Sequence, residues 1–357
     1  YSCYLFIQVL NPNMYNIQGW IIYIRGFIRN GILIFIALRL LRTWPEIYTF
    51  FKYWLGMSTL AGVYACIQQA IGLFPFERSY IAKFPEKFNT VILQGRVRIF
   101  SFMADPAAFG ILMACGVILC LVLLTASSQL VNFRKKALLL FMVIVQLLGL
   151  AFSGTRTAYV MLPMGLILFF LLNIQNRNTV ITAIVCAFGM AVLLFGPFYG
   201  NPTIVRVRSA FVGSKDESMQ VRDINRHSVQ PYIHSHPIGG GLMTTGNSGS
   251  SLNPGHPLAG FQTDSGYLHA ALELGWIGLI VVCLYMYMGF KYAVSNYFRC
   301  DKPFNKLLLT GMAAVLFSII VAQYAQEAAG LVETSILVNV FMAISINVKY
   351  NLNNSKI

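Results

Sequence analysis

The chain has 357 residues, of which 57% are hydrophobic and only 11% are charged. Soluble domains carry about 25% charged residues, so a water-soluble globule is excluded, and the hydrophobic content excludes a disordered chain. The net charge is +14. In a membrane protein such a surplus usually reflects lysine and arginine in cytoplasmic loops, so no nucleic-acid partner is expected. The seven cysteines form no CxxC pair, which predicts neither a zinc site nor a disulfide framework.

Stretches of about 20 apolar residues predict membrane-spanning helices. We expect one partial span at residues 1–10 and whole spans at about 19–41, 49–73, 105–127, 137–152, 158–173, 179–198, 266–291, 306–325 and 331–348. The predicted fold class is therefore an all-α polytopic membrane protein with about nine to ten transmembrane helices and one large extracytoplasmic loop. Because the chain begins at Tyr1 inside an apolar run, we expect further helices upstream.

The positions of the spans divide the chain into three expected parts. Residues 1–198 form an N-terminally truncated transmembrane bundle, residues 199–263 the large loop, and residues 264–357 the C-terminal transmembrane helices with a cytoplasmic C-terminus. Within the loop, the polar stretch 216–236 has Pro231 as its only glycine or proline and favours a helix, whereas 237–260 is rich in Gly, Ser, Asn and Pro and predicts irregular structure.

Alternate short loops carry the basic residues that set the expected orientation. By the positive-inside rule these loops face the cytoplasm. Their 13 basic residues are Arg39, Arg42, Lys52, Arg134, Lys135, Lys136, Arg177, Lys291, Arg299, Lys302, Lys306, Lys349 and Lys356. The two long polar segments, 75–104 and 199–263, are then expected on the outer face.

The outer segments are rich in arginine, whose guanidinium group holds phosphate oxygens with two parallel hydrogen bonds. An anionic ligand such as a lipid-linked phosphate or diphosphate is therefore expected there. Arg156 turns between two apolar helices in Ser153-Gly-Thr-Arg156. A charge so close to the hydrocarbon is either functional or an interfacial arginine that only contacts lipid head groups.

Other polar residues also have purely structural explanations. Arg25 and Arg29 share one face of the first full span and indicate either a substrate groove or an interfacial segment. Asp105, followed by Pro106, is expected to cap a helix. The histidines of the large loop lack the spacing of a metal site, and no nucleotide-binding or serine-hydrolase motif occurs.

Several weak motifs together carry a resemblance to a known family. They are Gly95-Arg-Val-Arg-Ile-Phe-Ser-Phe-Met-Ala-Asp-Pro106, Ser153-Gly-Thr-Arg156, Arg222 in the large loop, His236-Pro-Ile-Gly-Gly-Gly241, Asp264-Ser-Gly-Tyr-Leu268 and Glu273-Leu-Gly-Trp-Ile-Gly278. Over about residues 95–350 the chain resembles the O-antigen ligase/polymerase family of bacterial polysaccharide assembly enzymes. The resemblance implies a GT-C-like helical bundle in the bacterial inner (cytoplasmic) membrane, with its active site facing the periplasm or outside.

The resemblance also implies an activity, partners and site residues. Family members are inverting glycosyltransferases that need no metal or other cofactor. They move a glycan from undecaprenyl diphosphate to a hydroxyl of a second glycan or of lipid A–core, among membrane lipids. Arg156 and Arg222 match the two arginines that bind the diphosphate, and Arg226, one turn after Arg222, is expected to bind it with them.

The catalytic base is the point at which the chain departs from the family. Ligases usually carry a His-Asn pair where this chain has Asp264-Ser265. Asp264 could act as the base, although aspartate is a weaker base than histidine. His236 or His256 could instead reach the acceptor, and His269 lies further into the following span. This departure favours a polymerase or another acceptor over strict ligation to lipopolysaccharide.

Two other classes of function stay open on the sequence alone. A transporter or flippase of lipid-linked oligosaccharide would need paired broken helices and charges near the midplane of the membrane. A membrane scaffold without chemistry would leave the arginine-rich outer segments unexplained. The concentration of polar residues in one loop favours chemistry at one face.

Overall fold

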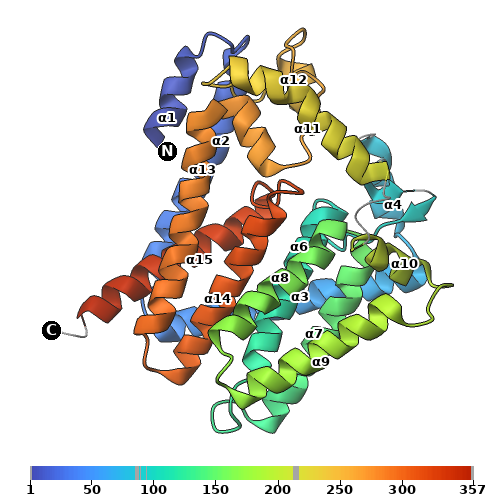
Figure 1. Cartoon of the computed structure of the whole chain (residues 1–357), viewed down its shortest axis with the longest axis vertical. Helices are drawn as coiled ribbons and strands as arrows, with labels where there is room; N and C mark the ends of the chain where they lie inside the picture. The colour runs from blue at the N-terminus through green and yellow to red at the C-terminus, as the bar shows by residue number, and fades with distance from the viewer. Residues whose placement is uncertain (1, 85–87, 89, 94, 212–216, 355–357) are drawn as a thin grey trace. The chain divides into compact units, whose positions relative to one another are not determined.

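The computed structural model describes residues 2–84, 88, 90–93, 95–211 and 217–354 (Figure 1). Within these ranges the only strands are β1 (Ile92–Leu93) and β2 (Arg96–Val97), which pair antiparallel with Leu93 opposite Arg96. The rest of the regular structure is helical, and the predicted all-α class is confirmed.

Most of the long helices follow the apolar runs of the sequence, and shorter or more polar helices lie between them. The helices are α1 (Ser2–Ile7), the 3-10 helix η1 (Gln8–Leu10), α2 (Ile17–Leu40), α3 (Trp44–Ile71), α4 (Pro75–Lys83), α6 (Pro106–Leu124), α7 (Phe133–Ser153), α8 (Arg156–Leu172), α9 (Arg177–Phe195), α10 (Pro202–Ser209), α11 (Glu217–Ser235), α12 (Gly246–Leu252), α13 (Gly266–Arg299), α14 (Pro303–Ala322) and α15 (Val332–Asn354). The helix predicted within residues 216–236 is confirmed as α11. The prediction of irregular structure across 237–260 is wrong for the seven residues of α12. A backbone hydrogen bond from Asn253 N to Gly249 O marks the C-terminal end of this helix.

Seven helices of the described chain are long and apolar enough to cross a membrane: α2, α6, α7, α9, α13, α14 and α15. The pair α3 and α4, bent by 93°, would make an eighth span. The predicted number of nine to ten is not confirmed, because α8 has only 17 residues and the region 1–10 holds only the short helices α1 and η1. The chain is a multi-pass membrane protein.

The chain divides into two compact units. Unit 1 consists of Tyr1–Leu40, Gly213–Lys291 and Ile320–Ala343, and unit 2 consists of Leu41–Val212, Tyr292–Ile319 and Ile344–Ile357. Each unit therefore combines segments that lie far apart in the sequence.

Helix α6 lies at the centre of unit 2, where it contacts α3, α7 and α8. Most of its side chains are buried. Asp105 caps the helix as predicted, since its Oδ1 accepts hydrogen bonds from the backbone N of Ala107 (2.7 Å) and of Ala108 (2.9 Å). Polar side chains also bond between the spanning helices of this unit. Gln146 Nε2 on α7 donates to Thr59 Oγ1 on α3 at 3.0 Å.

A break in helix α13 organises unit 1. Gly275 has φ 67° and ψ −166°, a conformation that side-chain-bearing residues rarely adopt. The loop segment 237–241 fills the break, because Trp276 N donates to Pro237 O (3.0 Å) and Gly240 N donates to Leu272 O (2.8 Å). The loop predicted from the sequence is thus hydrogen-bonded into a spanning helix rather than separate from it.

The N-terminal segment of unit 1 holds the same loop from another side. Asn13 Nδ2 donates to Gly239 O at 2.9 Å, and Gln8 Nε2 donates to Ile238 O at 3.0 Å. On α2, Arg25 and Arg29 are both exposed. Their side chains therefore do not enter the interior of unit 1.

Candidate functional site: an arginine-lined pocket

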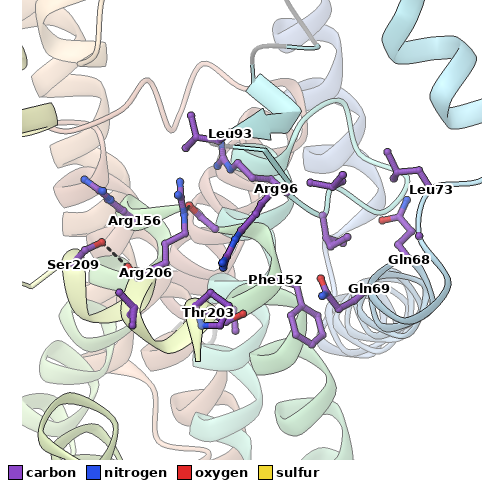
Figure 2. A pocket seen from close by; sticks show the side chains of 18 of the residues that line it. Gln68, Gln69, Leu73, Leu93, Arg96, Phe152, Arg156, Thr203, Arg206 and Ser209 are labelled. Atoms are coloured by element: carbon purple, nitrogen blue, oxygen red, sulfur yellow. Dashed lines mark hydrogen bonds between the residues drawn. The ribbon is translucent and has the colours of Figure 1, made fainter. Parts of the chain in front are cut away.

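Unit 2 contains a pocket of about 850 Å³ beside the turn that joins α7 to α8. Figure 2 shows side chains that surround it, from the strand β2, the α7–α8 turn and the helix α10. Four arginines line the pocket: Arg96, Arg98, Arg156 and Arg206. Among the described residues of the lining there is no aspartate or glutamate, so the pocket is strongly cationic.

The α7–α8 turn has a backbone shape that brings two of these arginines close. Gly154 ends α7 in the left-handed conformation, with φ 62°. Its carbonyl oxygen accepts a hydrogen bond from Arg206 Nε at 2.8 Å. A Cβ atom at Gly154 would lie 2.8 Å from the same nitrogen. Glycine is required here by the backbone conformation and by the approach of the guanidinium group.

Arg98 makes three hydrogen bonds, two of them to the α7–α8 turn. Its Nε donates to Ser153 O, its Nη2 to Thr155 Oγ1 and its Nη1 to Thr90 O, each at 3.0 Å. Burial, and to a lesser extent the positive charge of Arg206, lower the pKa of Arg98 to about 10. The guanidinium groups of Arg98 and Arg206 are thus held near one another in a partly desolvated environment. A bound anion would reduce their mutual repulsion.

Arg156 is the first residue of α8, as predicted from the turn sequence, and its side chain is half-buried. The N-terminus of a helix carries partial positive charge and free backbone N–H groups. The N-terminal residues Pro202 and Thr203 of α10 also line the pocket. Guanidinium groups and helix N-termini are both typical partners of phosphate oxygens, so the pocket suits a phosphate or diphosphate group.

Anion binding can be tested without any reaction. Millimolar pyrophosphate is expected to raise the melting temperature of the detergent-solubilised protein by several degrees, because a ligand of the folded state stabilises it by mass action. Arg206→Ala is expected to reduce this shift. Arg208→Ala is the matched control, since Arg208 lies on the same helix, donates to Leu193 O at 2.8 Å and does not line the pocket. Equal shifts in all three proteins would contradict anion binding at this pocket.

The two other predicted diphosphate-binding arginines lie on α11 of unit 1. Arg222 falls among the residues for which only the backbone is described. Arg226 donates from Nη1 to Tyr324 Oη (2.9 Å) and from Nη2 to Tyr324 O (3.0 Å), and its guanidinium carbon lies 4.2 Å from the centre of that ring. Arg226 therefore joins α11 to the segment after α14 within unit 1.

The predicted base candidates also belong to unit 1. Asp264 is half-buried two residues before α13. His236 stacks on Tyr232 with ring centres 4.0 Å apart, and its Nδ1 lies 2.8 Å from Ser235 Oγ. His256 is buried, and its Nδ1 accepts a hydrogen bond from Leu258 N at 3.1 Å. The ring of His256 thus holds the loop together from inside.

The environment of His256 predicts a pH-dependent stability. Burial lowers its pKa, while hydrogen bonds with the backbone of Asn13 and Gly240 act against this shift. Between the lowered pKa and about 6.5, the unfolded chain binds more protons than the folded chain, so stability falls as the pH drops through this window. The melting temperature is expected to fall on acidification from pH 7.5 to 5.5. His256→Gln should show a smaller fall, and an unchanged slope in this variant would contradict the assignment.

A further group of polar side chains in unit 1 received no site role from the sequence. His269 Nε2 lies 3.3 Å from Glu273 Oε2, and His269 Nδ1 lies 3.8 Å from Glu327 Oε2. Glu273 also accepts hydrogen bonds from Met243 N (2.9 Å) and from Thr245 Oγ1 (2.7 Å). The sequence signal was a histidine and a glutamate four residues apart on an apolar helix. No group of three or more His, Cys, Asp or Glu in the described ranges could hold a metal ion.

Many apolar helices and a pocket lined by arginines define the class: a multi-pass membrane protein with a cationic pocket. A profile of the O-antigen ligase family matches residues 141–283, which include Arg156, Arg206 and Asp264. The match confirms, over these residues, the resemblance to the O-antigen ligase family noted in the sequence. No curated protein and no solved structure matches the chain.

Proposed function

We propose that the chain is a glycosyltransferase of the O-antigen ligase/polymerase type. It moves an oligosaccharide from undecaprenyl diphosphate to a sugar hydroxyl of a glycan or of lipid A–core. The observation that carries the proposal is the pocket with four arginines and no described acidic residue, two of whose arginines, Arg156 and Arg206, lie inside the matched domain. A lipid-linked diphosphate has the charge and the oxygen geometry that such a pocket binds.

The proposed reaction is a single displacement at the anomeric carbon of the donor. The acceptor hydroxyl oxygen forms the new bond to this carbon, and the bond from the carbon to the diphosphate oxygen breaks with its electron pair leaving on the diphosphate. Arg156, with Arg98 and Arg206, stabilises the charge that develops on the leaving group. Arg222 and Arg226 are proposed to contribute to the same step, and Asp264 is proposed to take the hydroxyl proton, with His236 and His256 as the alternatives.

The proposed glycosyltransferase function comes with a proposed location of the active site in the membrane. We place the active site on the outer face of the bacterial inner membrane, since the basic loops of the sequence are expected to face the cytoplasm. The sugar–diphosphate bond is already activated, so the proposed reaction needs no nucleotide and no metal. We further propose about nine to ten spans with residues 199–263 on the outer face.

Purified protein incubated with carrier-linked oligosaccharide tests the proposal. We expect a ladder of carrier-linked products if the acceptor is a second repeat unit. If the acceptor is lipid A–core, a glycan-capped core is expected when lipid A–core is added. Intact donor in both reactions, with protein that still elutes as a single species, would overturn the proposed function.

A further inference from the structure

Unit 1 contains a second cavity, whose chemistry differs from that of the arginine-lined pocket. Its volume is about 460 Å³, within the range of about 300–1,000 Å³ that small-molecule sites occupy. It is lined by residues of the apolar helices α2, α13 and α15, and by residues that follow α14. Polar groups among spanning helices are costly and are functional candidates for that reason.

One buried atom in each of two side-chain amides of this cavity's lining lacks a hydrogen-bond partner in the described chain. Asn339 on α15 is buried, and its Oδ1 accepts a hydrogen bond from Tyr285 Oη at 2.7 Å. That bond orients the amide, yet Asn339 Nδ2 has no partner in the described chain. Asn30 Oδ1 on α2 is likewise buried and without a partner there. Buried polar groups are nearly always hydrogen-bonded, so a donor and an acceptor of the lining are both available to a ligand.

Charge excludes a phosphate from this cavity. No lysine or arginine is among its described lining residues, which include the carboxylates of Glu273 and Glu327. His269 lies between these two carboxylates and, when protonated, offsets one of the two negative charges. Glu273 is already engaged by the loop segment 243–245, whereas the Glu327 side chain is 42% exposed. The exposed carboxylate of Glu327, together with the unpartnered Asn339 Nδ2 and Asn30 Oδ1, suits ligand hydroxyls, which both donate and accept hydrogen bonds.

We infer that this cavity binds a neutral sugar ring through Asn339, Asn30 and Glu327. The inference rests on the proposed function and deepens it, because a transferase needs a place for a hydroxyl-bearing ring as well as for the diphosphate. The two pockets differ in charge, because one is cationic and the other is acidic to neutral. The ring belongs to the acceptor glycan or to the donor glycan, which have the same hydroxyl chemistry.

Steady-state kinetics with Asn339→Leu test the inference. The loss of one hydrogen bond to a neutral ligand costs about 0.5–1.5 kcal/mol, so the KM for one glycan is expected to rise about 2- to 10-fold. A rise in the acceptor KM alone places the acceptor ring in the cavity, and a rise in the donor KM alone places the donor ring there. Asn347→Leu on the same helix is the matched control, because Asn347 does not line the cavity, and its KM values should stay at the wild-type level.

A binding measurement separates this inference from the proposed reaction. A panel of methyl glycosides is expected to include one that raises the melting temperature of the wild-type protein but not of Asn339→Leu, while the pyrophosphate shift is retained in both. A wild-type protein that transfers no glycan but shows this difference would overturn the proposed function and support the cavity. The inference would be overturned if Asn339→Leu and Glu327→Gln both melt like wild type and keep wild-type KM values. Both variants would then also show the wild-type rise in melting temperature with the methyl glycosides.

Discussion

Replacing Arg156 by alanine is expected to lower the kcat/KM of glycan transfer about 10²- to 10³-fold. Removing one preorganised donor from the site where charge develops usually costs about 2.7–4 kcal/mol of transition-state stabilisation. Arg156 is the only one of the four pocket arginines that stands at the start of an apolar helix, so its charge adds to that of the helix N-terminus. The measurement is transfer from carrier-linked oligosaccharide by purified variant and wild type.

The controls for Arg156 come from the chain itself. Arg177 is the first residue of α9, another apolar helix, and does not line the pocket. Arg177→Ala is therefore expected to retain wild-type transfer. Arg156→Lys keeps the charge but loses the paired donors of the guanidinium group, and intermediate activity is expected. Transfer by Arg156→Ala within a few-fold of wild type, in protein that inserts and elutes normally, would remove Arg156 from the site.

Local sequence signals predicted the helices of this protein well. Apolar runs predicted the spanning helices, and the Asp105–Pro106 pair predicted the start of α6. The number of spans was harder to predict, because composition does not say whether a 17-residue helix such as α8 crosses a membrane. The prediction of α11 had a weaker basis than that of the apolar helices. It depended only on the near absence of glycine and proline from a polar stretch.

Tertiary contacts decided the rest of the candidate site. Arg98 and Arg206 were two among many arginines of the polar segments, and only the fold brings both to the backbone of one turn. The unpartnered amide nitrogen of Asn339 is likewise not evident in the sequence, where Asn339 is one polar residue in an apolar helix. The glycine-rich stretch 237–260 predicted irregular structure, but not that residues 239–241 lie against Gly275.

Replacing Gly275 by alanine is expected to destabilise the folded protein severely. Its φ of 67° is strained for any side-chain-bearing residue, at a cost of about 1–3 kcal/mol. The added Cβ would also lie 2.0 Å from Pro237 O and 2.5 Å from Gly239 N, so segment 237–241 must move out of the break in α13. Together these effects place the loss of stability at about 4 kcal/mol or more, the range of severe single substitutions.

Thermal unfolding of the solubilised protein, followed by tryptophan fluorescence, measures this loss directly, because Trp276 adjoins the break. Gly239→Ala should have a similar effect, since its Cβ would lie 2.4 Å from Glu273 O and its φ is 82°. Gly26→Ala is the matched control in unit 1, with no atom within 4 Å of the added Cβ, and its helical position predicts equal or slightly higher stability. A Gly275→Ala protein that melts at the wild-type temperature would show that segment 237–241 does not occupy the break. With segment 237–241 displaced, the N–H groups of Gly240 and Gly241 lose their bonds to the carbonyls of α13, so both the loop and the spanning helix would be left with unsatisfied backbone groups.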